Sequence, residues 1–187
     1  MQKKVFATLL IFFVLNLIFL PFLVTFNDFL TKVVEGVHAY SLLQQYLVPI
    51  EVKMVVVLLS PFHIRLAAST TGVIVNGLYA GITWNCIGWQ SLLLFCLSLI
   101  VGLRISYTKQ SMGEAIAIGL VGTFLINLLR MAFTVLLLAY SQPLFAVIFH
   151  DYLAAGVTIG WLFVFWWFAY GFVLETKIDI SKENALR

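Results

Sequence analysis

The feature that most constrains this chain is a series of long apolar runs whose charged residues lie at their ends. Of the 187 residues, 63% are hydrophobic and only 10% are charged, and the mean hydropathy is +1.06. A soluble domain has about 25% charged residues, because polar side chains must cover its core. The runs therefore predict a protein whose solvent is largely lipid. The formal net charge of +3 is small, so it predicts no nucleic acid partner.

Four segments are predicted to cross a bilayer, which takes about 20 helical residues. They are 5–26, 87–103, 113–140 and 151–174. Basic residues gather on the cytoplasmic side of membrane proteins. One multi-pass topology, in a plasma membrane, places all of the following there: Lys3, Lys4, Arg104, Lys109, Lys177, Lys182 and Arg187.

The segment 27–85 then lies outside the cell membrane, partly bound to its surface. Apolar residues recur at helical spacing within 29–37, which is typical of an amphipathic helix in the interface. Segment 45–60 predicts a re-entrant or half-inserted helix, and a full crossing stays open as an alternative. Asn76 and Gly77 lie between two β-prone runs, which predicts a hairpin. The predicted fold is an all-α polytopic membrane protein of one domain: a helical bundle of four full spans, an interfacial or re-entrant helical segment and a small outer β-hairpin.

Cys86, in the sequence TWNCIGWQS, lies where the predicted hairpin leads into the second span. A helix N-terminus lowers the pKa of a nearby thiol, and the thiolate is the nucleophile. Gly88 permits close backbone approach, and Trp89 suits the membrane interface. The alternative is a small buried hydrophobe, which is our interpretation of Cys96. The two cysteines form no CxxC motif and have no neighbouring Cys/His array, so they predict neither a disulfide framework nor a metal site.

Arg130 interrupts the third predicted span, where an arginine costs at least about 2.5 kcal/mol. It lies about 26 Å along the helix from Gly113, near the outer interface, and Asn127 lies one turn below it. The alternative is an anchor that extends to water. His150 stands at the outer end of the fourth span, where Asp151 is predicted to cap the helix. Histidine is the side chain best suited to proton transfer near neutral pH, although an interfacial polar residue is the alternative.

Three of these residues are remote in the sequence but share one depth in the predicted topology. A nucleophile, a cation and a base would then meet near the outer leaflet, as attack on a carbonyl requires. The predicted catalytic residues are Cys86, Arg130 and His150. The predicted substrate-binding or supporting residues are Asn127, Gly88, Trp89 and Asp151.

Three short sequences resemble motifs of the archaeosortase/exosortase family of membrane cysteine transpeptidases. NCIGWQSLLLF resembles its Cys-x-Gly-x-x-Ser box, INLLRMAF resembles its Asn-x-x-Arg box, and FHDYLAAG has a histidine at the third expected position. Ile87 stands where the more usual family box has a serine directly after the cysteine. The resemblance covers about residues 70–174 and indicates a short variant.

The resemblance implies a mechanism and a substrate class. Cys86 would attack the scissile carbonyl and form a thioester, Arg130 would stabilise the anionic sulfur or the oxyanion, and His150 would transfer protons. The substrate would be a secreted protein with a C-terminal motif, a transmembrane helix and a basic cluster. The acceptor would be a membrane lipid amine, another polymer or water. Neither a metal nor an organic cofactor is implied.

Two other classes of protein compete with this interpretation. A small transporter subunit would use Arg130 as an anion contact, and it predicts polar residues in the middle of several spans, of which this chain has few. A non-catalytic assembly factor would use small-residue faces for helix packing. The glycines that predict such faces are Gly119, Gly122, Gly156 and Gly160.

Overall fold

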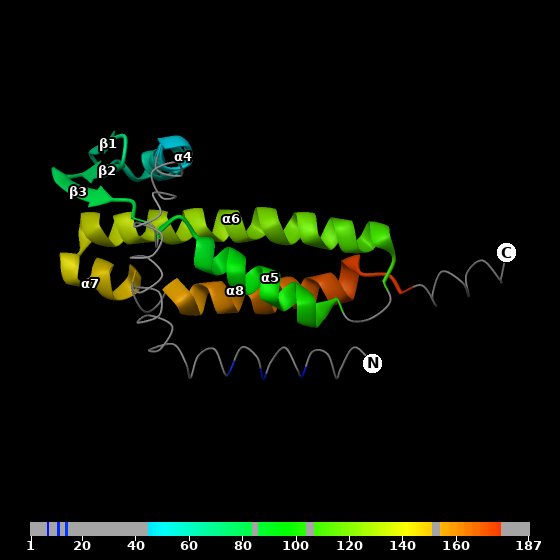
Figure 1. Ribbon diagram of the computed structural model, residues 1–187. Helices are drawn as coiled ribbons and strands as arrows, with labels where there is room; N and C mark the ends of the chain where they lie inside the picture. Colours follow the sequence, from blue (N-terminus) through cyan, green and yellow to red (C-terminus); the bar gives the residue numbers. More distant parts are fainter. Residues whose placement is uncertain are drawn as a thin grey trace, which may run out of the picture.

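The computed structural model of the chain describes residues 45–83, 86–103, 107–150 and 154–176, together with the single positions 7, 11 and 14. The rest of the predicted first span and the predicted amphipathic helix at 29–37 lie outside the described residues. The four stretches form one body around a long central helix (Figure 1).

That central helix is α6 (Lys109–Tyr140), on which most of the other elements pack. It begins where the Thr108 side chain accepts a hydrogen bond from the Ser111 N–H, which satisfies one donor of the first turn. Its sequence is apolar and free of proline until Pro143, beyond the helix end. At 1.5 Å per residue, its 32 residues extend about 48 Å.

Helices α5 (Trp89–Gly102) and α8 (Ala154–Phe168) lie alongside the N-terminal part of α6 (Figure 1). Helix α8 continues directly into a π-helical turn, η4 (Ala169–Val173). Hydrogen bonds join the helices: Trp166 Nε1 donates to Ser98 Oγ at 3.0 Å, for example. The shared core of these helices is largely aromatic, and its buried members include Phe95, Leu162, Phe165 and Trp166.

A small antiparallel sheet lies over the C-terminal part of α6, with the strand order β1 (Leu66–Ala68), β2 (Gly72–Val75), β3 (Leu78–Gly81). Asn76 and Gly77 connect β2 to β3 with φ angles of 50° and 86°, as a two-residue hairpin turn requires. The predicted pairing around this turn is confirmed. The third strand, β1, was not predicted, so the expectation of an all-α fold with only a hairpin is wrong.

Helix α4 (Val48–Leu59), followed by the 3₁₀ turn η1 (Ser60–Phe62), packs against both the sheet and α6. Two hydrogen bonds fix this layer to the end of α6. Asn76 Nδ2 donates to Ala139 O at 3.2 Å, and Tyr140 Oη donates to Phe62 O at 2.9 Å. The core between the layers is mostly branched aliphatic, with Val48, Val52, Val55, Leu59, Val73, Val75, Leu128, Met131 and Val135 buried.

The expectation of four full spans is also wrong. Among the described residues, only Lys109–Tyr140 and Gly156–Val173 are long and apolar enough to cross a membrane. The helix within the predicted span 87–103 is α5, whose 14 residues extend about 21 Å, short of a core about 30 Å thick. The predicted helix within 45–60 exists as α4, but its 12 residues are shorter still.

Candidate active site

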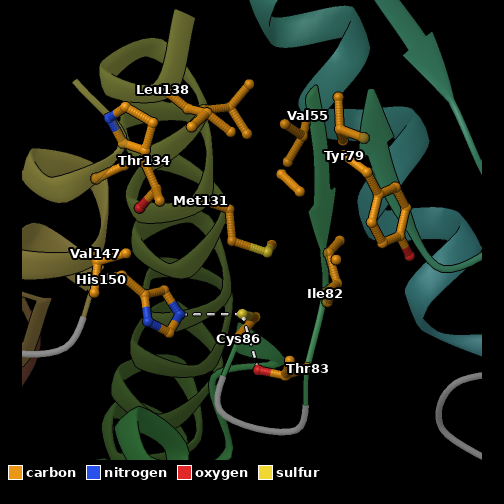
Figure 2. Close-up of a pocket in the computed structure, with 16 residues that line it drawn as sticks. Val55, Tyr79, Ile82, Thr83, Cys86, Met131, Thr134, Leu138, Val147 and His150 are labelled. Atoms are coloured by element: carbon orange, nitrogen blue, oxygen red, sulfur yellow. Dashed lines mark hydrogen bonds between the residues drawn. The ribbon is translucent and has the colours of Figure 1, made fainter. Parts of the chain in front are cut away.

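Cys86 lies in the short connection between strand β3 and helix α5, held by a turn in which its N–H donates to Thr83 O at 2.9 Å. Its sulfur is 3.1 Å from Nε2 of His150 and 3.4 Å from Oγ1 of Thr83 (Figure 2). The residue is only 8% exposed. A thiol and an imidazole from segments 64 residues apart therefore form a direct hydrogen-bonded pair.

His150 reaches the thiol from a short helix, α7 (Pro143–Ile148), that packs against α6. It stands two residues after the end of α7, in the section where Phe149 packs its ring on Phe133 of α6, with ring centroids 4.7 Å apart. Figure 2 shows the imidazole on one side of α6, aimed across it at the sulfur. The packing of α7 thus fixes the direction of approach of the base.

The pKa of the Cys86 thiol is about 7, below its ordinary value of 9.0. Burial raises this pKa, but the hydrogen bond to His150, the charge of His150 and the hydrogen bonds to Thr83 together lower it more. Near neutral pH a large fraction of Cys86 is therefore the thiolate, which is the nucleophilic form. The lowering comes from His150 and from both the side chain and the backbone of Thr83, and the predicted effect of a helix N-terminus is not among its causes.

The main-chain carbonyl of Cys86 accepts two hydrogen bonds from α6. Asn127 Nδ2 donates at 2.9 Å and Arg130 Nη2 donates at 3.3 Å. The loop that contains Cys86 can come this close to α6 because Gly88 has no side chain. A Cβ at position 88 would lie 2.6 Å from Asn127 Cγ, which is too close. The φ of +83° at Gly88 also favours glycine. The predicted supporting residues Asn127 and Gly88 thus hold the loop that carries the nucleophile.

Arg130 is buried inside the protein, only 6% exposed, which is contrary to the alternative of an anchor that extends to water. Its guanidinium contacts the main chain of Cys86, and its charge also interacts with those of Cys86 and Glu51. The three predicted catalytic residues therefore converge, with the cation beside the backbone of the nucleophile.

The thiol faces a pocket of about 470 Å³ between strand β3, α6 and α7. Most of its wall is apolar. Thr83 and His150 contact the sulfur, and Tyr79 and Thr134 are the pocket's other polar lining residues besides Cys86 itself. A pocket of this kind accepts an apolar group and presents it to a nucleophile and a base. Its lining includes Val55, Tyr79, Ile82, Met131, Leu138 and Val147 (Figure 2).

The other residues singled out in the sequence have mixed outcomes. Trp89 begins α5 and is half-buried, and it is not among the residues that line the pocket. Asp151, the predicted cap, lies outside the described residues. Cys96 is exposed on α5, so its interpretation as a buried hydrophobe is wrong.

Sequence reasoning missed two residues near the thiol. Thr83 contacts the sulfur because a turn folds it back three residues before Cys86. Glu51 is fully buried on α4, and its charge interacts with those of Cys86 and Arg130. A carboxyl within the apolar run of 48–59 was a signal for this site, because such a group is costly to bury without a purpose.

In the part of the chain that the structure describes, no group of three His, Cys, Asp or Glu side chains is placed to hold a metal ion. The chemistry that this site can perform with its own residues is nucleophilic attack by sulfur with proton transfer by imidazole. Comparisons of the chain with models of protein families, with curated proteins and with solved structures give no match.

Proposed function

We propose that this protein is a membrane cysteine peptidase or transpeptidase of the archaeosortase/exosortase type, which cleaves C-terminal sorting signals of secreted proteins. The observation that carries the proposal is the 3.1 Å contact between Cys86 Sγ and His150 Nε2 beside an apolar pocket. A thiol with a pKa of about 7 paired with an imidazole is the usual arrangement of an activated cysteine nucleophile. The resemblance of the three sequence boxes adds the substrate class.

In the proposed acylation step, the Cys86 thiolate attacks the scissile carbonyl carbon and forms a C–S bond. The tetrahedral intermediate collapses as the C–N bond breaks, and the His150 imidazolium gives its proton to the leaving amine. A thioester and a neutral imidazole remain. An amine or water then attacks the thioester, His150 takes the proton of that nucleophile, and the thiolate leaves.

Arg130 supports this chemistry with its fixed positive charge. It interacts with the charge of Cys86 and donates to the carbonyl of the same residue. A buried cation beside the nucleophilic residue favours the thiolate and the anionic intermediate, since both carry negative charge in a site with little water.

A peptide in extended conformation is the substrate that suits this pocket. Strand β3 is an edge strand of the described sheet, and its residues 79–81, with the following Ile82 and Thr83, line the pocket up to Cys86. A peptide laid beside an edge strand gains main-chain hydrogen bonds, while an apolar pocket selects its side chain. An apolar residue next to the scissile bond is therefore expected in the sorting motif.

The proposed location is the plasma membrane, with the site on the extracytoplasmic side. Two helices, α6 and the segment 156–173, are long and apolar enough to cross it. Lys109 begins α6, and the sheet lies over its other end (Figure 1). The main chain of Cys86 contacts Asn127 and Arg130, also far along α6 from Lys109. A cytoplasmic position of Lys109 and the other basic residues therefore supports a site on the outer side.

This topology is tested with cysteines at the two ends of α6, in a background in which both native thiols are removed, Cys86→Ser with Cys96→Ser. Thr70→Cys introduces a thiol beside the sheet, and Gln110→Cys introduces one in the first turn of α6; both parent residues are exposed. In intact cells, a membrane-impermeant maleimide should label the first and not the second. Labelling of Gln110→Cys alone would reject an outward site.

The catalytic proposal is tested in membranes of cells that carry Cys86→Ala, with Cys96→Ala as the matched control. Mass spectrometry of C-terminal peptides should find precursors that keep their C-terminal segment only in the first strain. Hydroxylamine added to the control membranes should release a C-terminal hydroxamate, because it intercepts a thioester. Identical C-termini in both strains and no hydroxamate would contradict the proposal.

A further inference from the structure

The hydroxyl of Thr83 is a polar group at the sulfur to which the proposed mechanism gives no task. Its Oγ1 lies 3.4 Å from Cys86 Sγ, and Nε2 of His150 lies 3.1 Å from the same sulfur. Figure 2 shows the two groups reaching the sulfur from different sides. Thr83 also lines the pocket that would receive the substrate. The hydroxyl is therefore placed beside the reacting atoms and apart from the base.

The proposed chemistry needs a hydrogen-bond donor that the mechanism has not yet assigned. Attack by sulfur on a carbonyl puts a negative charge on the carbonyl oxygen, and a donor aimed at this oxyanion stabilises it. The main-chain N–H of the nucleophile often takes this part. Here the N–H of Cys86 donates to Thr83 O at 2.9 Å, so the turn already uses it. A side chain of the pocket can take its place.

The other hydroxyls of the pocket are used elsewhere. Thr134 Oγ1 donates to Arg130 O at 3.0 Å within α6. Tyr79 Oη is bonded to Thr71 Oγ1 at 2.6 Å, and Figure 2 shows its ring turned away from the sulfur. The imidazole is needed for proton transfer. Among the described residues that line the pocket, Thr83 is thus the donor that fits, in a polar set made of Tyr79, Thr83, Cys86, Thr134 and His150.

We propose that Thr83 is a further catalytic residue, whose hydroxyl donates to the sulfur in the resting thiolate and to the substrate oxygen in the tetrahedral intermediate. The inference rests on the proposed function, because it needs attack by Cys86 on a carbonyl. Since Oγ1 and Sγ are 3.4 Å apart, the oxygen of a carbonyl carbon bound to the sulfur can lie about 3 Å from both atoms. Only the hydroxyl hydrogen has to rotate.

The hydrogen bond follows the negative charge through the reaction. A thiolate has no hydrogen, so the hydroxyl is the donor in the resting pair. When the C–S bond forms, the π electrons of the carbonyl move to its oxygen, and the sulfur becomes a neutral, weak acceptor. The hydroxyl then donates to the oxyanion and keeps its own proton. When the C–N bond breaks, the electrons on oxygen re-form the carbonyl, and the leaving amine takes its proton from His150.

Arg130 has a different part from that of Thr83. Its Nη2 donates to Cys86 O at 3.3 Å, and Arg130 is not among the described residues that line the pocket. The guanidinium therefore acts on negative charge from the main-chain side of the nucleophile, through its electric field. Such a field favours the thiolate and the intermediate alike. Loss of the Thr83 hydroxyl should instead disfavour the intermediate more than the thiolate.

The test compares two reactions of Cys86 in the purified full chain, in a Cys96→Ser background. Iodoacetamide alkylates the thiolate without an oxyanion, whereas p-nitrophenyl acetate acylates it through one. Both reactions use the thiolate, so the ratio of their rates at one pH is independent of the thiolate fraction. Loss of one oxyanion donor slows enzymes about 100-fold or more, and an activated ester needs part of that help. Thr83→Val should therefore lower the ratio of acylation to alkylation at least about ten-fold.

Three further variants decide whether the hydroxyl is the cause. Thr83→Ser keeps a hydroxyl and should restore the ratio. Thr83→Ala removes the hydroxyl with a smaller side chain, so it should lower the ratio even if Val disturbs the turn. Thr70→Val makes the matched replacement at an exposed position outside the pocket lining and should change neither rate. A ratio equal to that of the parent in Thr83→Val or Thr83→Ala, or a loss that Thr83→Ser does not restore, would overturn the proposal.

The ester assay also separates this proposal from the proposed function, because it needs no sorting signal. If Cys86→Ala leaves the processing of precursors intact, the proposed function fails, while a lowered ratio in Thr83→Val still identifies the oxyanion donor. If the proposed function holds, processing in membranes should fall about 100-fold in Thr83→Val and persist in Thr83→Ser. Unchanged processing in Thr83→Val would contradict the role of Thr83 alone.

Discussion

The two ends of helix α6 are packed in different ways. The aromatic half, made of α5, α8, η4 and the N-terminal part of α6, joins rings at close range, such as Phe95 and Phe165 at 5.4 Å between centroids. The site half, made of α4, the sheet, α7 and the C-terminal part of α6, joins branched aliphatic side chains around buried polar groups and a pocket. Buried aromatic contacts give rigidity, whereas a buried carboxyl and a buried guanidinium lower stability. The comparison indicates that the aromatic half stabilises the fold, whereas the site half carries buried polar groups that lower its stability.

The largest expected effect is that of His150→Gln in the site half. The variant removes the hydrogen bond and the charge that lower the pKa of Cys86, while burial still raises it. At pH 7 the thiolate fraction should fall from about half to about 1%, which slows alkylation by iodoacetamide roughly 50-fold. In the parent the rate of alkylation should rise as the pH passes through 7. In the variant this rate should rise only near pH 9 or above. The exposed His63→Gln is the control, and an equal loss in it would contradict the assignment.

Gly88→Ala should disturb the site half through the backbone. Its φ of +83° costs an L-residue about 1–2 kcal/mol, and its Cβ would press on Asn127. The Asn127 bond to Cys86 O should break, and alkylation of Cys86 should slow by about ten-fold or more. Gly77→Ala is the matched control, since Gly77 has a similar φ but open space around it. It should lower the free energy of unfolding and leave alkylation unchanged.

Gly119→Ala should affect the aromatic half and leave the thiol alone. A Cβ at Gly119 would overlap the ring of Phe95, which is 0% exposed and cannot move aside. Overpacking of this kind costs about 1–3 kcal/mol, measured as the free energy of unfolding in mixed micelles. Gly160→Ala, which meets nothing within 4 Å, should be neutral or stabilising. Slower alkylation of Cys86 in Gly119→Ala would show that the halves are not independent.

The smallest effect is expected for Trp161→Phe. It keeps an aromatic ring but loses the hydrogen bond from Nε1 to Thr123 Oγ1 at 3.2 Å, which contributes about 1 kcal/mol. Unfolding in mixed micelles should detect the loss. Trp167→Phe, an exposed tryptophan on the same helix, should change stability less. A larger loss of stability in Trp167→Phe than in Trp161→Phe would contradict this prediction, because it would mean that the Trp167 side chain makes a stabilising contact despite its exposure.

The sequence predicted those features that depend on local chemistry. The hairpin followed from Asn76 and Gly77, because few other residues adopt positive φ at both positions of a turn. The long helix α6 followed from its apolar composition. The proximity of His150 and Cys86 was predicted from their shared depth in the membrane, although the predicted number of spans was wrong.

The remaining features depend on tertiary contacts that no local pattern encodes. Strand β1 is three residues long and exists through its pairing with β2. Helix α7 has six residues, too few to be stable alone, so no local pattern predicts it. The raised pKa of the buried Glu51 likewise depends on tertiary structure, because burial is its largest cause and Cys86 and Arg130 act on it from two other segments.

Because α6 is one unbroken helix, it fixes the distance between its residues across the bilayer. From Lys109 to Arg130 the rise is about 32 Å at 1.5 Å per residue, close to the thickness of the hydrocarbon layer, about 30 Å. With Lys109 at one face, Arg130 and the main chain of Cys86 that it contacts lie near the other face. Under the proposed function, a substrate's own anchoring helix would emerge from lipid at that level. Each residue inserted between these two positions would lift the reaction by about 1.5 Å and turn it by about 100° around the helix axis. Under the proposed function, the height of a peptide bond above the membrane would then select it for cleavage as much as the sequence around it.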